Sequence, residues 1–377
     1  MYITGIGRTK FGILNETLPE LIYKAMVSAM KDANLLIKDI DTIYVANFCS
    51  GPIQNQLHLN SIIASLLPKT NIPIIRIEAA CASGGVALYQ ALISLAKFRR
   101  IMIVGVEKMS NVDSSKVTGS ISAAGDKILD QTEGLTFPAS YALIAQQHIL
   151  RYGTTLDDLS LVSLKNHENG NLNEFAHFYY KKVDIEMIKN SRIVCSPLRL
   201  FDCAPISDGA SALVVSREKI SARDVKVIGS SMATDSISPA QRKSLTSFNA
   251  VKIAVKEACS QANISVHSID IAEVHDCFTI AELIAMEDIG FCKPGESKDY
   301  AREGRTRLDG DIPINTDGGL KADGHPIGAS GIAQVYEIVT QLRGEAGKRQ
   351  TKNPEIGLVH NIGGIGGTAV IHILKRS

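Results

Sequence analysis

The sequence carries an internal repeat, and this repeat constrains the fold more than any other feature. Three pairs of segments match in the same order along the chain: 29–45 with 258–274, 82–84 with 329–331, and 211–214 with 368–371. Both members of the first pair show helical spacing followed by a β-branched run, and they share Ala, Ala, Asn, Ile, Asp and Val at one constant offset. Such a repeat predicts an α/β fold made of two duplicated halves.

The first half is longer than the second. Between its second and third matching segments it contains about 90 residues more, which predicts an insertion. We expect the first half to span 1–218, with an inserted loop domain at about 107–196, and the second half to span 219–377. The insertion contains the polar run 166–171 and the aromatic cluster 175–180, a composition more typical of a lid than of a sheet core.

Charge and cysteine content restrict the partners and the compartment. The 377 residues include 40 Lys and Arg and 39 Asp and Glu, so the net charge of +1 gives no basis for attraction to nucleic acid or an acidic membrane. The 7 cysteines are an odd number without a C-x-x-C pair, which favours a reducing compartment over a disulfide framework. Neither a signal peptide nor an apolar run of membrane-spanning length is evident. We therefore expect a cytoplasmic protein that spans no membrane.

One cysteine stands where a predicted strand turns into a helix. Residues 72–77 are β-branched and predict a strand, 88–96 have helical spacing, and 101–106 predict a second strand, which places Cys81 in a β-turn-α-β unit. The helix dipole and unpaired N–H groups at such a turn favour thiolate over thiol. The small residues 82–85 allow a substrate carbonyl to approach the backbone. The alternative is a small buried cysteine that only packs under the helix.

His325 precedes the corresponding helix of the second half. If a pseudo-twofold axis relates the halves, the two helix N-termini face one centre, where His325 and Cys81 can meet. A neighbouring histidine is the commonest way to ionise a cysteine near neutral pH. Outside this repeat, the same histidine would be interpreted as a loop residue bonded to the backbone.

A second candidate group follows the predicted strand 271–274, at the end where open α/β sheets bind ligands. Cys277 offers an acid or base there, and His275 offers a hydrogen-bond donor. A zinc site is not expected, because these two side chains alternate faces if the strand continues and no C-x-x-C supplies further ligands. Asp276 is expected to cap the helix 279–286.

Glycines precede the last predicted strand. The run Gly364 to Ala369 fits G-x-G-x-x-A, but a dinucleotide-binding fingerprint needs a helix after the glycines, and here a short strand follows. Free glycine N–H groups beside the cysteine suit an oxyanion hole instead. A serine hydrolase is not supported, because the sequence contains no G-x-S-x-G.

Together these motifs resemble the thiolase superfamily, and most closely the sterol-carrier-protein type and the similar archaeal thiolases. The resemblance covers essentially the whole chain and rests on four segments in order: Cys81-Ala82-Ser83-Gly84, 202–210, His275-Asp276-Cys277-Phe278, and 324–329. It implies two halves layered α-β-α-β-α, with a loop domain inserted in the first half.

The resemblance also implies the roles of the site residues. Cys81 would accept the acyl group, and His325 would activate it and help to bind the thioester oxygen. Cys277 would exchange the α-proton of the second thioester. His275, which stands where conventional thiolases have asparagine, would contribute to one oxyanion hole, and the N–H groups of Cys81 and Gly363 would form the other.

One position departs from conventional thiolases. They carry their second cysteine ahead of the terminal glycines, where this chain has Asn361, whereas the sterol-carrier type uses the cysteine after His-Asp, here Cys277. The resemblance further implies that Ala204, Pro205 and Ser207 contact the pantetheine arm of coenzyme A.

The expected function is that of an acetyl-CoA C-acetyltransferase, which condenses two acetyl-CoA molecules into acetoacetyl-CoA without a bound cofactor or metal. The resemblance implies a homodimer or homotetramer and a partnership with hydroxymethylglutaryl-CoA synthase through a small scaffold protein, feeding mevalonate synthesis. Three alternatives stay open: a degradative 3-ketoacyl-CoA thiolase, a non-catalytic acyl-CoA or lipid-binding subunit, and a β-ketoacyl synthase. Two thiols and two imidazoles argue against a binding subunit, and Cys277 argues against the synthase.

Overall fold

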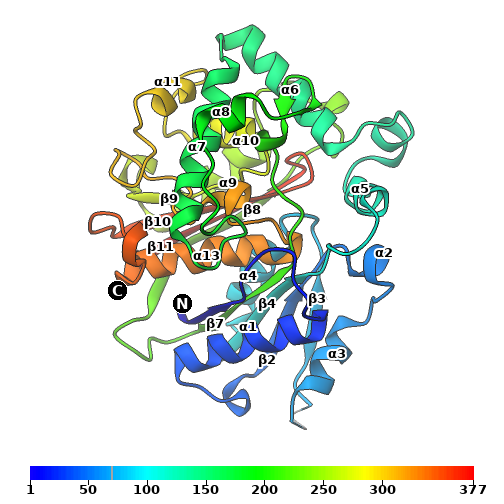
Figure 1. Cartoon of the computed structure of the whole chain (residues 1–377). Helices are drawn as coiled ribbons and strands as arrows, with labels where there is room; N and C mark the ends of the chain where they lie inside the picture. The colour runs from blue at the N-terminus through cyan, green and yellow to red at the C-terminus, as the bar shows by residue number, and fades with distance from the viewer. Residues whose placement is uncertain (69–70) are drawn as a thin grey trace.

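The computed structural model describes residues 1–68 and 71–377. Its main sheet has two parts. The strands of the first part are β1 (Tyr2–Arg8), β2 (Thr42–Ala46), β3 (Ile74–Ile77), β4 (Arg100–Glu107) and β7 (Gly209–Ser216). Those of the second part are β8 (Val225–Thr234), β9 (Ile271–Glu273), β10 (Ile356–Gly363) and β11 (Thr368–Arg376). The order is β3-β2-β4-β7-β1-β8-β11-β10-β9, and β1 joins β8 through Tyr2 and Ile3 (Figure 1).

The two parts have the same topology, which confirms the predicted duplication. β2 is parallel to β4 as β9 is to β10, β4 is antiparallel to β7 as β10 is to β11, and β7 is antiparallel to β1 as β11 is to β8. Ile314 forms a parallel bridge with Ala272 of β9 and thereby takes the place that β3 has beside β2.

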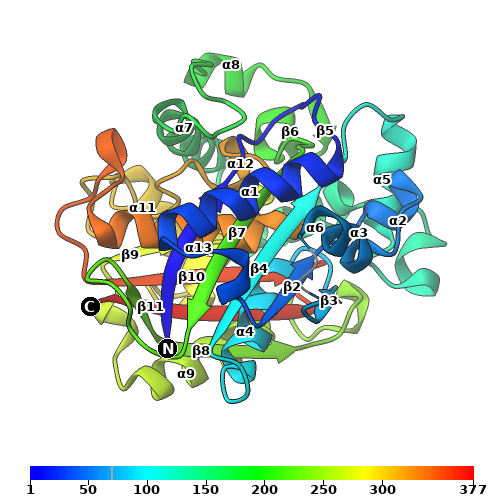
Figure 2. The same cartoon turned by 90° about the horizontal axis from the view of Figure 1, so that it is seen from below.

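The outer helices end in the same way in both halves. Helix α1 (Leu18–Ala33) is followed by Asn34 at φ 52°, and α9 (Asn249–Ala262) is followed by Asn263 at φ 53°. Asparagine tolerates this left-handed conformation better than most residues, which explains why it recurs in the repeat. Figure 2 shows α1 lying across the strands of the first part, where it contacts β1, β7 and β4.

Two helices, α4 (Ser83–Ser94) and α13 (Ile327–Arg343), form the middle layer between the two sheet parts. They cross at equivalent glycines of the repeat. A Cβ added to Gly84 would lie 3.2 Å from Gly331 Cα, and a Cβ on Gly331 would lie 2.6 Å from Gly85 N. Only glycine permits this approach. The layers are therefore α1, first sheet part, α4 with α13, second sheet part, and α9, as predicted.

The chain between β4 and β7 packs mainly against the second half. It contains α5 (Ser114–Ser122), a π-helical turn (Lys127–Gln131), α6 (Phe137–Tyr152), α7 (Leu156–Leu172), α8 (Ile185–Lys189), β5 (Ile193–Cys195), β6 (Leu198–Arg199) and a 3₁₀ turn (Leu200–Asp202). The lid prediction for 166–171 is wrong, because this run lies in α7 and is held by buried amides. Asn166 donates to Glu282 at 2.7 Å, and Asn169 donates to the Asn315 carbonyl at 2.9 Å.

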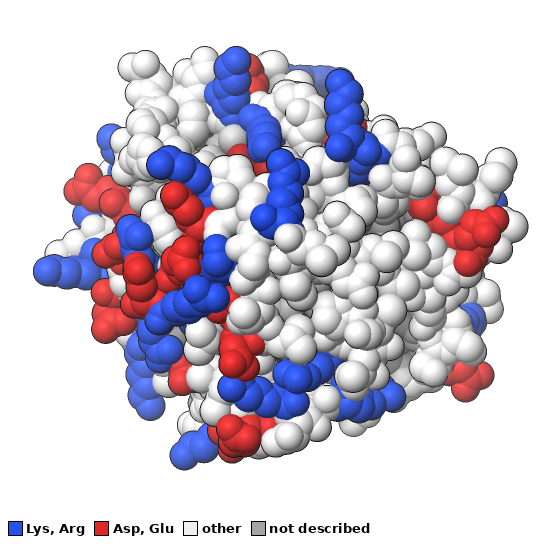
Figure 3. All heavy atoms as spheres, turned by 90° about the horizontal axis from the view of Figure 1, so that it is seen from above, with Lys and Arg blue, Asp and Glu red and all other residues white. Residues whose placement is uncertain are grey.

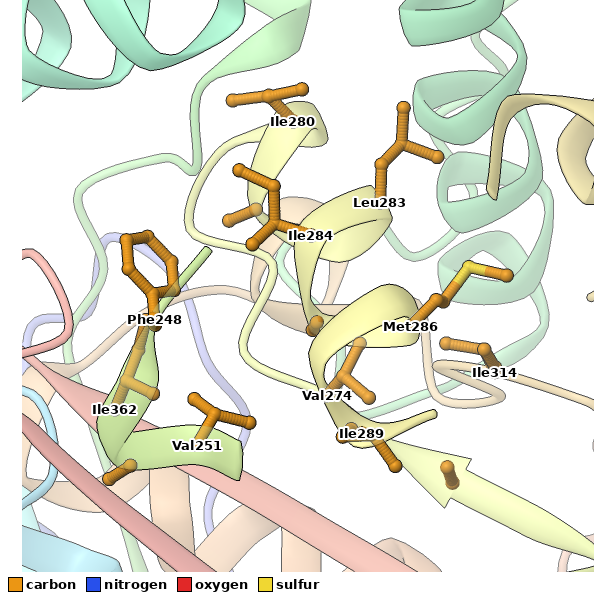
Figure 4. Close-up of a cluster of buried hydrophobic side chains, with 14 of the residues drawn as sticks. Phe248, Val251, Val274, Ile280, Leu283, Ile284, Met286, Ile289, Ile314 and Ile362 are labelled. Carbon is orange, nitrogen blue, oxygen red and sulfur yellow. The ribbon is translucent and has the colours of Figure 1, made fainter. Parts of the chain in front are cut away.

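A large apolar core lies on the outer face of the second sheet part. Its centre is α10 (Thr279–Ile289), whose eleven residues are all buried. Figure 4 shows Ile284 of this helix beside Phe248, and Val251 and Ile362 nearby. The remaining helices are α2 (Ser50–Gln54), α3 (Leu59–Leu66), α11 (Ser297–Arg302) and α12 (Gly319–Ala322), with 3₁₀ turns at Ile37–Asp39, Pro239–Gln241, Val266–Ser268 and Gly347–Arg349. Across the described ranges, no helix combines the length and apolarity needed to cross a bilayer.

Candidate active site

Cys81 occupies a tight turn between β3 and α4. The preceding Ala80 has φ 50°, a left-handed conformation that is unusual for a residue with a Cβ and that turns the chain sharply into the helix. The residue is 5% exposed and lines a cavity of about 440 Å³ together with Cys277, His325 and Gly364. The turn thus presents the sulfur to a space that can hold a ligand.

Two histidines from the second half flank this thiol. The Cys81 sulfur and one ring nitrogen each of His275 and His325 lie within 4.8 Å of one another. The two imidazole rings are 5.2 Å apart and nearly perpendicular, at 85°. His325 precedes α13 and His275 follows β9, so the repeat brings Cys81 and His325 together as the sequence suggested.

The hydrogen bonds of His325 define which nitrogen is free. Its Nδ1 lies 2.7 Å from Ser330 Oγ, and that hydroxyl donates its own proton to the Pro326 carbonyl at 3.0 Å. Ser330 therefore accepts from Nδ1–H, and Nε2 carries no proton in the neutral ring. Burial lowers the pKa of His325 to about 3, which keeps the ring neutral at pH 7. Its Nε2 is a proton acceptor.

His275 has the opposite tautomer. The Asn361 oxygen accepts from the Gly85 N–H at 3.1 Å, so the Asn361 nitrogen must face the Cys81 carbonyl and His275 Nδ1, both at 3.1 Å. Because Nδ1 accepts this bond, the ring proton is on Nε2. That Nε2 is buried and has no partner among the described residues. Burial also lowers the pKa of His275 well below its usual value. The ring therefore offers a free N–H donor.

The expectation of a resting thiolate at Cys81 is not met. Burial raises the pKa of the thiol to about 12, although an N–H bond from Gly364 acts in the opposite direction. The nearby carboxylate of Glu107 raises this pKa further. The centre rests as a neutral thiol beside a neutral imidazole, because exclusion of water outweighs the helix dipole.

The second thiol, Cys277, also lines the cavity, and beside it lies Tyr141, which no sequence pattern revealed. Burial raises the pKa of Cys277 well above the usual value, and the nearby Tyr141 hydroxyl, which is buried without a hydrogen-bond partner among the described residues, acts in the opposite direction. Tyr141 lies in α6 of the insertion and stacks on Phe278, with ring centroids 4.5 Å apart. No local motif marks this tyrosine, because its place beside Cys277 depends on how the insertion docks.

Glu107 at the end of β4 is another buried group that no motif marks. It accepts from the Cys49 N–H at 2.8 Å and from the Gly328 N–H of α13 at 2.9 Å. Burial raises the pKa of this carboxyl to about 7. The bond to Gly328 ties the start of α13, and hence His325, to the first half.

Of the other site residues predicted from the sequence, two line the cavity and two lie outside its lining. Ala204 and Pro205 line it, and the Ala204 N–H donates to the Cys277 carbonyl at 2.9 Å. Ser207 is fully buried outside the lining, with its hydroxyl 2.9 Å from His177 Nδ1. Gly363 ends β10 behind the Cys81 turn, whereas the neighbouring Gly364 lines the cavity.

The helix-cap prediction for Asp276 is wrong. Its carboxylate accepts from the Leu320 N–H at 2.7 Å and the Lys321 N–H at 3.3 Å, so it caps α12 instead of α10. It also accepts from Asn166 at 2.7 Å. The side chain turns toward these donors because α7 and α12 pack beside it, a tertiary arrangement that local spacing does not encode.

Residues between β4 and β7, such as Phe137 and Leu200, form part of the cavity wall. The wall is mostly apolar, and Arg192 is the exposed cation among the lining residues. Within the described ranges, Arg192 forms no ion pair. Figure 3 shows the face seen from above, where Lys and Arg side chains border a broad area without charged groups. An anionic ligand with an apolar arm matches this lining.

Sulfur and imidazole nitrogen are also the ligands that zinc prefers. The described part of the chain contains one group of donor atoms close enough to hold such an ion, and it consists of Cys81, His275 and His325. Whether they bind one depends on which ring nitrogens carry protons, because a protonated nitrogen cannot coordinate a metal.

The duplicated layers and the thiol set between two imidazoles define a class of enzymes that transfer acyl groups through a cysteine. Residues 1–219 match the family model described as thiolase, N-terminal domain, and residues 230–376 match the model described as thiolase C-terminal domain-like. The chain belongs to the thiolase family.

Relatives span the whole chain. It is 44% identical to the acetyl-CoA acetyltransferase of Methanothermobacter thermautotrophicus over 99% of both chains. It is 30% identical to human sterol carrier protein 2, covering 100% of this chain and 72% of that one. The solved structure of the Ltp2-ChsH2(DUF35) aldolase superimposes with a TM-score of 0.86 at 23% identity, over 100% of this chain and 98% of that chain, which shows the shared fold.

Proposed function

We propose that this protein is an acetyl-CoA C-acetyltransferase that forms acetoacetyl-CoA through an acyl-enzyme on Cys81. The observation that carries this proposal is the pair of histidines with opposite tautomers around one thiol, with a second thiol on the same cavity. The acetyl-CoA acetyltransferase at 44% identity supports the choice of substrate.

In the first half-reaction, the Cys81 sulfur attacks the thioester carbonyl of acetyl-CoA while His325 Nε2 takes the thiol proton. Backbone N–H groups of Cys81 and of the Gly363–Gly364 turn stabilise the charge that develops on the oxygen. A donor of this kind contributes about a hundredfold or more to the rate. The departing sulfur of coenzyme A takes the proton of Cys277, which leaves acetyl-Cys81, protonated His325 and the Cys277 thiolate.

In the second half-reaction, the Cys277 thiolate removes an α-proton from a second acetyl-CoA. The Tyr141 hydroxyl stabilises that thiolate, and the Nε2–H groups of His275 and of protonated His325 stabilise the enolate oxygen. The enolate carbon bonds to the acetyl carbonyl carbon, and the bond from that carbon to the Cys81 sulfur breaks. His325 then returns its proton to Cys81, so every proton is accounted for. The same residues catalyse thiolysis in reverse.

The apolar lining suits the pantetheine arm, with Ala204 and Pro205 on its wall and Arg192 placed to meet a phosphate of coenzyme A. Thioesters of coenzyme A are the substrates, and no bound cofactor or metal takes part. We place the enzyme in the cytoplasm as a homodimer or homotetramer that supplies mevalonate synthesis. Its partners would be hydroxymethylglutaryl-CoA synthase and a small scaffold protein. Co-purification under gentle conditions tests this partnership, and clean separation of the three proteins contradicts it.

The catalytic proposal is tested by intact mass after brief incubation with acetyl-CoA. We expect an acetyl adduct on the wild type and on Cys277→Ala, and none on Cys81→Ala. Acetoacetyl-CoA should form with the wild type alone. Absence of an adduct from all three folded proteins would refute the enzyme and favour a subunit that only binds acyl-CoA.

A further inference from the structure

Asn361 does more than fill the position where conventional thiolases have a cysteine. Its nitrogen donates to His275 Nδ1 at 3.1 Å and so dictates that the ring proton sits on Nε2. We infer that Asn361 is a positioning residue with two effects: it fixes His275 as a donor, and it prevents a divalent cation of zinc type from binding at Cys81, His275 and His325. The donor effect rests on the proposed function, whereas the exclusion of metal does not.

The centre would otherwise be suited to zinc. A sulfur and two imidazole nitrogens lie within 4.8 Å of one another, in a buried setting, with the cavity as a fourth open position. Cys81 would bind as the thiolate and release its proton to solvent, and His325 already presents a bare Nε2. The obstacle is His275, because coordination through Nε2 requires its proton to move to Nδ1.

That proton cannot move while Asn361 keeps its present orientation. A proton on Nδ1 would point at the two hydrogens of the Asn361 nitrogen, so two buried donors would face each other. Turning the amide over would break its bonds with the Gly85 N–H and the Cys81 carbonyl. The backbones of Gly85 and Gly331 pack close to this amide, since a Cβ on either residue would meet its oxygen at less than van der Waals distance.

The argument predicts how substitutions change metal affinity. In Asn361→Asp, a carboxylate oxygen accepts from Nδ1–H and frees Nε2 as a ligand, which creates the carboxylate–histidine–metal arrangement common in zinc proteins. Such outer-shell groups change metal affinity about 10- to 100-fold. Asn361→Ala removes the donor without adding an acceptor, so its affinity should lie between those of the wild type and Asn361→Asp.

The first measurement uses the wild type alone. Nitrogen-15 NMR of imidazole-labelled, metal-free protein should show His275 with Nε2 protonated and Nδ1 bare, assigned by loss of the signals in His275→Gln. The second is titration of the full-length protein with Zn²⁺ against a chromophoric chelator. Zn²⁺ should bind Asn361→Asp at least 10-fold more tightly than the wild type. Asn169→Asp makes the same chemical change at a buried amide outside the centre and should bind Zn²⁺ like the wild type.

A protonated Nδ1 in the wild type would overturn the inference, as would equal Zn²⁺ affinity of folded Asn361→Asp and the wild type. In metal-free activity assays, Asn361→Asp should lower kcat with little change in KM, because the lost donor acts on the developing charge. Both the NMR and the Zn²⁺ readouts are independent of turnover. If the protein formed no acetyl adduct, the proposed function would fail while these two measurements still decided the tautomer and the exclusion of metal.

Discussion

Replacing Ser330 by alanine should impair the enzyme through the tautomer of His325. The Ser330 hydroxyl holds the proton on Nδ1 through a bond of 2.7 Å, and Nε2 is free to act as a base for that reason. Without the hydroxyl, the neutral ring can place its proton on Nε2, where it blocks proton transfer from Cys81. Misplacing the proton of a catalytic histidine in this way is a known route to large losses of rate.

The size of the effect follows from the lost bond. A buried hydrogen bond of this type contributes about 1–2 kcal/mol, which would reduce the share of rings with a bare Nε2. Since about 1.4 kcal/mol corresponds to a tenfold change, acylation should slow by about 5- to 30-fold. The assay is the rate of acetyl-adduct formation in a single turnover, followed by mass.

A matched control separates the effect of the His325 tautomer on acylation from the effect of losing a serine hydroxyl in a helix. Ser160 in α7 is equally buried and also donates to the carbonyl four residues earlier, at 2.8 Å, but it has no hydrogen bond to an imidazole among the described residues. Ser160→Ala should therefore lose the same kind of hydroxyl-to-carbonyl hydrogen bond as Ser330→Ala and leave the rate of acylation unchanged. Acylation by folded Ser330→Ala within twofold of Ser160→Ala would refute the reasoning.

Three further predictions concern stability and binding. Burial lowers the pKa of His372 to about 4, so as the pH falls below about 6.5 the unfolded chain binds a proton at this position and the folded protein does not. Between pH 7 and pH 5 this difference should lower the free energy of unfolding by about 2 kcal/mol. His372→Gln should abolish that part of the decrease, measured by urea unfolding. Gly331→Ala should lower stability by about 1–3 kcal/mol in thermal unfolding and slow the formation of acetoacetyl-CoA, because its methyl group displaces Asn361 from His275. Arg192→Ala should raise KM for acetyl-CoA about 2- to 5-fold with kcat unchanged in steady-state assays; an unchanged KM would remove Arg192 from the coenzyme site.

The features that could be predicted from the sequence are those fixed by backbone geometry. Asn34 and Asn263 recur because two helices end in the same left-handed conformation, and Gly84 and Gly331 recur because two helices cross at them. These repeats predicted two duplicated halves and the meeting of Cys81 with a histidine of the other half, whereas the layer order came from the resemblance to thiolases.

The features that could not be predicted depend on the tertiary environment. Tyr141 reaches Cys277 only because α6 docks on the second half, and Asp276 caps α12 because that short helix passes beside it. The raised pKa of Cys81 likewise reflects the exclusion of water from the assembled centre, to which residues from many parts of the chain contribute.

The crossing of α4 and α13 also bears on the order in which the chain becomes reactive during synthesis. The nucleophile belongs to the half that leaves the ribosome first, and its base belongs to the half that follows more than two hundred residues later. Until α13 has settled against α4, the thiol lacks the imidazole that would take its proton in the proposed acylation. The last long helix of the fold therefore completes the catalyst as it completes the core.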